Sequence, residues 1–122
     1  MQLIDTHAHI CFDSYDEDRS EMMNRAYQSG VFKIVHPCCS ITEIPTLLKL
    51  TEEYNGVNKI NLYTALGVHP SEINTWDDNS ANTIEQHLIA DINNPNSKIK
   101  AIGETGLDYY HAKAAHEQTK QR

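Results

Sequence analysis

The strongest constraint on the fold of this chain is a repeat of apolar segments that begin near residues 2, 31, 61 and 99. Each segment is followed by a stretch with helical spacing of apolar residues, at about thirty residues per strand–helix pair. This rhythm predicts successive βαβ units, whose strands lie parallel in one sheet. No low-complexity tract or linker divides the chain, so we expect one βα-repeat domain over residues 1–122.

The expected elements follow from local sequence signals. Ser14 and Glu17 have the spacing of a capping box at the start of the first helix, and Gly30 is placed to end it. The expected strands are Gln2 to Thr6, Val31 to Val35, Leu62 to Leu66 and Lys98 to Ile102. The expected helices are Ser14 to Ser29, Ile44 to Asn55, Ala81 to Asn93, and a fourth that begins in the tail after Ala112.

Composition and charge limit the class of partner. With 39% hydrophobic and 22% charged residues, the chain resembles ordinary soluble domains. A formal net charge of −7 argues against broad attraction to nucleic acid, but it leaves room for a phosphate ester held by bound cations. No segment has the apolar length of a membrane span and the N-terminus lacks signal-peptide features, so we expect a cytoplasmic protein with no membrane contact.

The cysteines do not suggest a structural framework. Cys11, Cys38 and Cys39 are odd in number and form no Cys-x-x-Cys motif. Neither a disulfide framework nor a cysteine zinc site is therefore predicted. We expect the adjacent pair Cys38-Cys39 to be half-buried thiols.

Residues suited to chemistry fall at the carboxyl ends of the expected strands, which is where parallel α/β folds build their sites. His7 and His9 alternate along an extended segment, so their imidazoles point the same way and make half of a metal site. The other strand-end residues are His36, His69, Glu104 and Asp108. The periodicity also allows a doubly wound sheet, but no glycine-rich phosphate turn follows the first strand, and a barrel brings His7, His9 and Glu104 to one mouth more directly.

Three motifs carry a family resemblance. They are Asp5-Thr6-His7-Ala8-His9, Gly67-Val68-His69-Pro70 and Gly103-Glu104-Thr105-Gly106-Leu107-Asp108-Tyr109. With these motifs in this order, the chain resembles the TatD family of metal-dependent deoxyribonucleases and related hydrolases over essentially all of its length. The resemblance implies a TIM-type (β/α)₈ barrel of the metallo-dependent hydrolase type, of which this chain holds about four βα units, the N-terminal half.

The resemblance also implies roles for individual residues. His7 and His9 bind one divalent ion, and Glu104, the catalytic candidate, binds metal and bridges where two ions are present; Mg²⁺, Mn²⁺ and Zn²⁺ all suit such ligands. His69 contacts substrate phosphate or caps its loop. Asp5 orients an imidazole or is a hydrogen-bonded barrel residue, and Asp108 is expected to hold the Gly-Leu-Asp loop through its backbone rather than to bind metal.

The family's remaining ligands, two histidines and an aspartate from later strands, have no counterpart in this sequence. His36, His87, His111 and His116 sit at no matching motif. We therefore expect a partial barrel, inactive or impaired alone, that is a fragment, a truncated gene product or a piece requiring a complementary half. Open strand edges and an exposed apolar interior favour self-association.

Three hypotheses of function follow. The first is a metal-dependent hydrolase that cleaves phosphodiester bonds of nucleic acid, as a deoxyribonuclease or exonuclease, or of a small phosphodiester, through metal-activated water. The second is a barrel amidohydrolase acting on C–N bonds, although that class expects a bridging carbamylated lysine where Glu104 stands. The third is an inactive half barrel that serves as an association module.

Overall fold

The computed structural model describes residues 1–122 and contains one sheet of four parallel strands. The strands are β1 (Leu3–Asp5), β2 (Val31–Pro37), β3 (Asn61–Leu66) and β4 (Ile99–Ile102). Their order in the sheet is β1-β2-β3-β4, so each strand lies beside the next one in the chain. A doubly wound sheet would reverse its strand order, whereas this consecutive order is that of a barrel. The chain has the fold of about half of a (β/α)₈ barrel.

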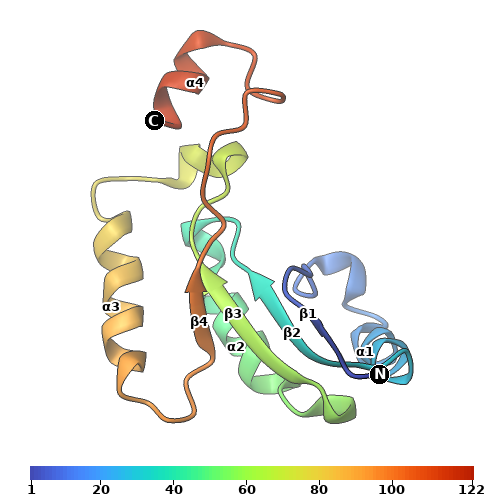
Figure 1. Ribbon diagram of the computed structural model, residues 1–122. Helices are drawn as coiled ribbons and strands as arrows, with labels where there is room; N and C mark the ends of the chain where they lie inside the picture. The colour runs from blue at the N-terminus through green and yellow to red at the C-terminus, as the bar shows by residue number, and fades with distance from the viewer.

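Helices connect the strands and cover one face of the sheet. The α-helices are α1 (Arg19–Gln28), α2 (Ile44–Tyr54), α3 (Ser80–Ile92) and α4 (Ala115–Lys120). Short 3₁₀ turns are η1 (Asp13–Tyr15), η2 (Ile41–Glu43), η3 (Val57–Lys59) and η4 (Pro70–Thr75). In Figure 1, α2 lies behind the strands, α1 and α3 flank them, and α4 stands beyond the ends to which the arrows point. No helix combines the length and apolar character needed to cross a membrane.

The core lies between the sheet and the helices. Met23 of α1 packs with Ile34 and Leu62, and Leu47 of α2 packs with Leu66, all of them buried. Each such side chain contributes about 1.5–3 kcal/mol when it leaves water. Because alternate residues of a strand face opposite sides, these contacts fix which side chains of β2 and β3 face the helices and which face away.

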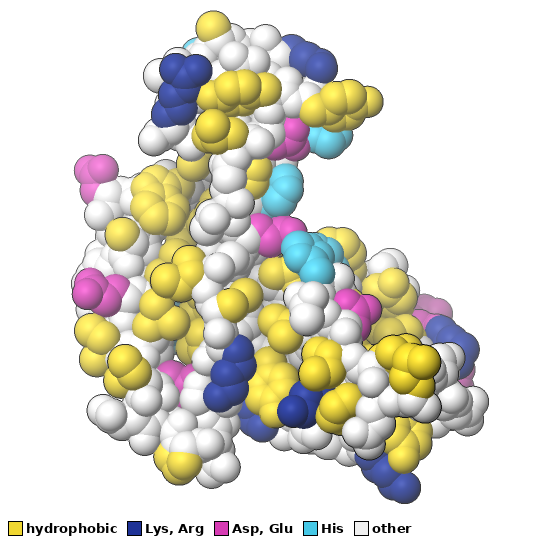
Figure 2. Space-filling view, viewed as in Figure 1, with side chains coloured by type: hydrophobic (Ala, Val, Ile, Leu, Met, Phe, Trp, Pro, Cys, Tyr) yellow, Lys and Arg dark blue, Asp and Glu magenta, His cyan; other side chains and the backbone are white.

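The opposite face of the sheet is open. The two outer strands are also uncovered: Leu3 and Ile4 of β1 and Ile102 of β4 are exposed, and β1 and β4 each pair with a single neighbouring strand. A hollow of about 540 Å³ lies on this face and extends to the carboxyl ends of the strands. Figure 2 shows apolar side chains along this face with lysine or arginine side chains among them, and histidine and acidic side chains gathered at its upper end. The expected open edges and apolar inner surface are therefore present.

The structure corrects the start of the first helix. Helix α1 begins at Arg19, whereas the spacing of Ser14 and Glu17 predicted a capped start at Ser14; Ser14 instead lies in η1. The buried guanidinium of Arg19 donates to the carbonyl oxygens of Ile10 (2.8 Å) and Phe12 (3.1 Å). These bonds hold the preceding segment against the start of the helix, and α1 begins at Arg19 despite the capping signal at Ser14.

Candidate metal centre

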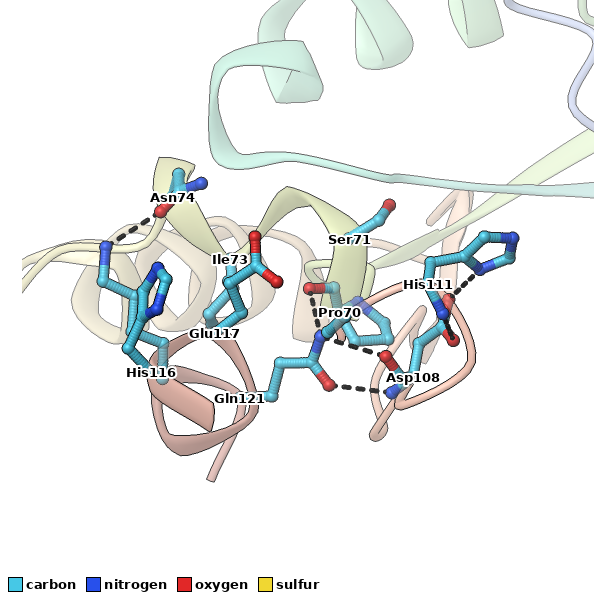
Figure 3. Close-up of a pocket in the computed structure, with 11 residues that line it drawn as sticks. Pro70, Ser71, Ile73, Asn74, Asp108, His111, His116, Glu117 and Gln121 are labelled. Carbon is cyan, nitrogen blue, oxygen red and sulfur yellow. Dashed lines mark hydrogen bonds and ion pairs between the residues drawn. The ribbon is translucent and has the colours of Figure 1, made fainter. Parts of the chain in front are cut away.

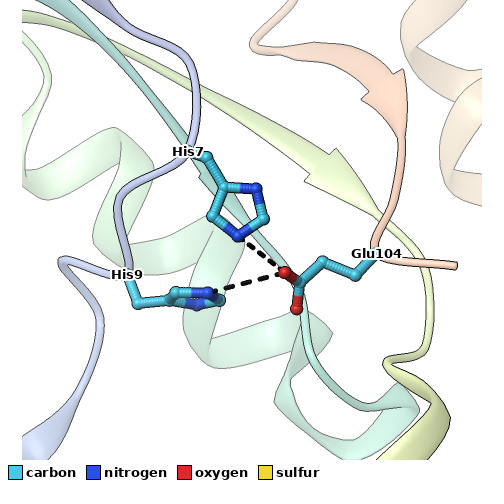
Figure 4. Close-up of side chains that lie close together, drawn as sticks. All are labelled: His7, His9 and Glu104. Carbon is cyan, nitrogen blue, oxygen red and sulfur yellow. Dashed lines mark ion pairs between the residues drawn. The ribbon is translucent and has the colours of Figure 1, made fainter. Parts of the chain in front are cut away.

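Two histidines and one glutamate converge at the carboxyl edge of the sheet. His7 Nε2 lies 2.6 Å from Glu104 Oε1, and His9 Nε2 lies 3.7 Å from the same oxygen. One ligand atom of each residue lies within 4.8 Å of the other two. Figure 4 shows both imidazoles directed at the carboxylate from the segment that follows β1. The structure thus brings together the three residues that the sequence predicted as metal ligands.

The histidine segment is held against the sheet. The N–H of Ala8 donates to Val35 O at 3.2 Å, which carries the pairing with β2 past the end of β1. The carboxylate of Asp5 accepts from the backbone N–H of His7 at 3.0 Å, so its recorded partner is the backbone rather than an imidazole. The ring of His9 stacks on Phe12, with centroids 4.8 Å apart. These contacts leave Nε2 of each histidine directed toward Glu104.

Gly67 allows Glu104 to reach this position. The backbone after β4 crosses the end of β3, where the N–H of Gly103 donates to Leu66 O at 2.9 Å. It then reaches the segment after β2, where the N–H of Glu104 donates to Cys38 O at 3.2 Å. A Cβ at Gly67 would overlap Glu104 O and would lie 2.5 Å from Gly103 C, closer than van der Waals contact permits. The glycine of the Gly-Val-His-Pro motif is therefore required by close backbone approach.

A thiol that no sequence motif indicated lies between His9 and Glu104. Cys39 Sγ lies 3.6 Å from His9 Nδ1 and 3.6 Å from Glu104 Oε2. Burial, together with the negative charges of Glu43 and Glu104, raises the pKa of Cys39 to about 12, so the group is a thiol at neutral pH. Its place directly after β2, where a parallel sheet positions its site residues, was the signal available in the sequence.

The residues present fit a divalent cation. Two imidazole nitrogens and a carboxylate oxygen are ligands for Zn²⁺ and Mn²⁺, and Mg²⁺ would need more oxygen ligands. Ligand atoms around a tetrahedral ion with bonds of about 2.1 Å stand about 3.4 Å apart, which these side chains reach by small movements. The side chain of His7 is 56% exposed, against 17% for Glu104, so the site is open on one side. That opening leaves room for water, substrate or further ligands.

His69 and Asp108 hold loops at the same edge. His69 Nδ1 accepts from the N–H of Ser71 at 3.1 Å and caps η4, while the residue also lines the hollow that contains His7 and Glu104. Asp108 accepts from the N–H groups of Tyr110 (3.0 Å) and His111 (3.1 Å). The hydrogen bond from the His111 side chain lowers the pKa of Asp108. Asp108 thus makes backbone contacts of the kind expected of a loop-holding residue.

A second hollow, of about 210 Å³, lies between η4 and α4. Figure 3 shows Asp108 and His111 at one side of it and His116 at the other. Gln121 donates to Pro70 O at 3.1 Å and its side-chain oxygen accepts from the N–H of Asp108 at 2.8 Å. These bonds tie the end of the chain to the loop beyond β4.

His36 and the remaining cysteines belong to the core. His36 lies inside β2, fully buried, with Nε2 at 2.6 Å from Thr51 Oγ1. Cys11 and Cys38 are buried, Cys39 is half-buried, and all are free thiols. Trp76 is 45% exposed and lines a hollow together with Ile73 and Ile84. None of these residues adds to the ligand set formed by His7, His9 and Glu104.

Consecutive parallel βα units with histidine and glutamate side chains together at their carboxyl edge are typical of barrels of the metal-dependent hydrolase class. The family model of the TatD related DNases matches residues 4–122. The chain belongs to this family.

Several curated relatives match over most of this chain. The uncharacterized metal-dependent hydrolase YjjV of Escherichia coli is 34% identical over 109 residues, covering 89% of this chain and 39% of the relative. The 3′-5′ ssDNA/RNA exonuclease TatD of Cronobacter sakazakii is 30% identical, covering 88% of this chain and 36% of the relative. The human deoxyribonuclease TATDN3 is 29% identical, covering 88% of this chain and 38% of the relative. The chain therefore spans about two fifths of the length of these relatives.

Solved structures agree on the fold. The crystal structure of the E. coli TatD homologue YjjV has a TM-score of 0.73 and 31% identity, and covers 98% of this chain and 44% of that structure. A TatD family hydrolase from Entamoeba histolytica has a TM-score of 0.80 at 24% identity, covering 99% of this chain and 43% of that structure. The similarity thus runs through the whole chain and through less than half of each solved structure.

Proposed function

We propose that this chain supplies the metal-binding N-terminal part of a hydrolase that cleaves phosphodiester bonds of nucleic acid. The observation that carries the proposal is the convergence of His7, His9 and Glu104 at the carboxyl edge of the sheet. The Cronobacter and human relatives, an exonuclease and a deoxyribonuclease, support nucleic acid as the substrate class. A DNA or RNA strand and a small phosphodiester share the chemistry that such a site recognises.

Each residue has a role in this proposal. A divalent ion bound there would act as a Lewis acid toward water and toward a phosphoryl oxygen. His7 and His9 hold it through neutral Nε2 atoms, and Glu104 supplies a negative oxygen ligand and is the catalytic candidate. His69 uses Nδ1 to cap η4, which leaves Nε2 free to donate to a substrate phosphate.

The charge of the hollow supports a role for cations. The residues that line it include Glu104 but no lysine or arginine. A phosphate approaching this carboxylate would be repelled unless positive charge were present, because the chain as a whole carries a formal charge of −7. Bound divalent ions supply that charge at the point where the phosphodiester must lie.

Metal titration is the first test. We expect the 122-residue chain to bind Mn²⁺ or Zn²⁺ in calorimetric titration, and His9→Ala to weaken this binding at least tenfold through loss of one ligand. His116→Ala, which changes an exposed histidine outside the ligand set, is the matched control. Equal binding by wild type and His9→Ala would refute the assignment of this centre.

A chimera tests the reaction. Residues 1–122 would replace the matching segment of the C. sakazakii exonuclease TatD, which supplies the remaining length. We expect the chimera to degrade single-stranded DNA, to lose activity with a chelator, and to leave a cyclic amide intact, which separates the nuclease from the amidohydrolase hypothesis. A folded chimera that is active on DNA after complete metal removal would contradict the mechanism.

The open sheet favours a second candidate function, association with a complementary half barrel or with a second copy. The edges of β1 and β4 lack a second neighbour, and Leu3, Ile4 and Ile102 are exposed beside them. Such edges pair with other strands. Light scattering after size exclusion tests this candidate: a dimer or larger species is expected for the chain alone, and a stable monomer at high concentration would exclude self-association.

A further inference from the structure

Cys39 lies where three elements of the metal centre meet. Its N–H donates to Glu43 Oε2 at 2.7 Å, and its carbonyl oxygen accepts from the N–H of His69 at 2.8 Å. The preceding residue, Cys38, donates to Ala65 O at 2.9 Å and accepts from the N–H of Glu104 at 3.2 Å. The backbone that carries the thiol is therefore fixed from η2, from the segment after β3 and from the segment after β4.

The sulfur atom reaches two ligands at once. Cys39 Sγ is 3.6 Å from Glu104 Oε2 and 3.6 Å from His9 Nδ1. Both atoms are on the sides of their groups that do not face the ligand cluster, since Glu104 Oε1 and His9 Nε2 are the atoms that approach each other, at 3.7 Å. The thiol thus contacts the outer atom of each ligand.

A thiol can serve both contacts together because it has one S–H donor and a sulfur acceptor. Donation to Glu104 Oε2 occupies that oxygen and leaves Oε1 for the ion. Acceptance from His9 Nδ1–H fixes the proton on Nδ1 and leaves the Nε2 lone pair facing Glu104. The second ring nitrogen of a metal-binding histidine almost always donates its N–H to an acceptor. That acceptor is usually a carboxylate, a carbonyl group or water, and here it is the thiol of Cys39.

We propose that Cys39 is a positioning residue of the metal centre, whose thiol sets the tautomer of His9 and the orientation of the Glu104 carboxylate. The proposal rests on the metal-binding function proposed above. It assigns Cys39 no contact with the ion or the substrate. Its effect passes through the two ligands that the thiol touches.

The first test uses the unaltered chain. In metal-free protein labelled with ¹⁵N-histidine, long-range ¹H–¹⁵N spectra are expected to show neutral His9 with its proton on Nδ1. A neutral His9 protonated on Nε2 would overturn the proposal. This readout requires neither enzymatic activity nor a variant that folds.

The second test compares metal affinity among variants of the same chain by following the absorption of Co²⁺. Cys39→Val, which approximates the shape of the thiol without its hydrogen bonds, is expected to weaken Co²⁺ binding about tenfold or more and to shift His9 away from the Nδ1–H tautomer. Cys39→Ser is expected to recover much of the affinity, because a hydroxyl both donates and accepts. Cys38→Ala removes the adjacent thiol, whose recorded bond is to Ser40 O at 3.0 Å, and is expected to bind as wild type does.

The outcomes separate this proposal from the function on which it rests. If the unaltered chain and Cys39→Val bound Co²⁺ equally well, the role of Cys39 would be overturned and the metal centre would stand. Failure of the unaltered chain to bind any divalent ion would instead refute the metal centre. Thermal melts check that each variant is folded, and if Cys39→Val is not, the tautomer of the unaltered chain decides.

Discussion

Acidification should destabilise this protein through His36. The imidazole is completely buried, and Nε2 lies 2.6 Å from Thr51 Oγ1. The Thr51 hydroxyl donates its own hydrogen to Leu47 O at 2.7 Å, so Nε2–H must donate to Thr51 and Nδ1 carries the lone pair. Nδ1 has no partner, so a proton added there would create a buried charge without an acceptor.

The magnitude follows from the pKa. Burial lowers the pKa of His36 from 6.5 to about 4; Glu43 opposes this shift and His9 adds to it. Because the unfolded chain takes up this proton near pH 6.5 and the folded chain does so only near pH 4, stability falls as the pH drops through this window. The full difference corresponds to about 3 kcal/mol, of which about 2–3 kcal/mol should be lost between pH 7.5 and pH 4.5.

Urea unfolding followed by circular dichroism at the two pH values measures this loss. His36→Gln, which cannot titrate, should lose about 2–3 kcal/mol less than the wild type over the same pH interval. His116→Gln removes an exposed histidine and should behave as the wild type does. If wild type and His36→Gln lost the same free energy of unfolding on acidification, the reasoning from burial would be refuted.

Three further predictions concern the surroundings of the metal centre. Arg19→Met should lower the free energy of unfolding by about 3 kcal/mol, because the carbonyl groups of Ile10 and Phe12 lose a buried charged donor. Urea unfolding at pH 7 measures this change, and a decrease of less than about 1 kcal/mol would contradict the prediction. Gly67→Ala should both lower the melting temperature and weaken Mn²⁺ binding, because its Cβ would overlap Glu104 O. Unchanged binding in calorimetry would contradict the inference that this glycine is needed to place the carboxylate. Zn²⁺ at about a hundredfold excess over its dissociation constant should stabilise the wild type by about 2.7 kcal/mol and should not stabilise His9→Ala. Melting curves recorded with and without EDTA test this difference.

Much of the fold was predictable because its signals are local. The apolar runs at Val31 and Leu62 gave β2 and β3 to within a few residues, and the helical spacing from Ile44 gave α2. The strand-end positions of His7, His9 and Glu104 predicted that these side chains meet, because all parallel strands end at one edge.

Other features depended on contacts that no local sequence pattern indicates. Ser14 carried a helix-start signal, but the bonds of Arg19 to the loop before it set the true start. His36 stands near the end of a strand as His69 does, yet β2 continues to Pro37 and alternation turns His36 toward α2. Cys39 had no motif, and its relation to His9 and Glu104 depends on the packing of three separate strand ends.

The ligands of the candidate metal centre come from the two outermost strands of the sheet. In a flat sheet, three spacings of about 4.8 Å would hold β1 and β4 about 14 Å apart. His7 Nε2 and Glu104 Oε1 nevertheless lie 2.6 Å apart, because the backbone after β4 crosses the end of β3 and reaches Cys38, and the two side chains span the remaining distance. An ion held there would be a reversible cross-link between residues almost a hundred positions apart in sequence. Its binding should therefore slow hydrogen exchange along β1, far more than in helix α3, which carries none of the ligands.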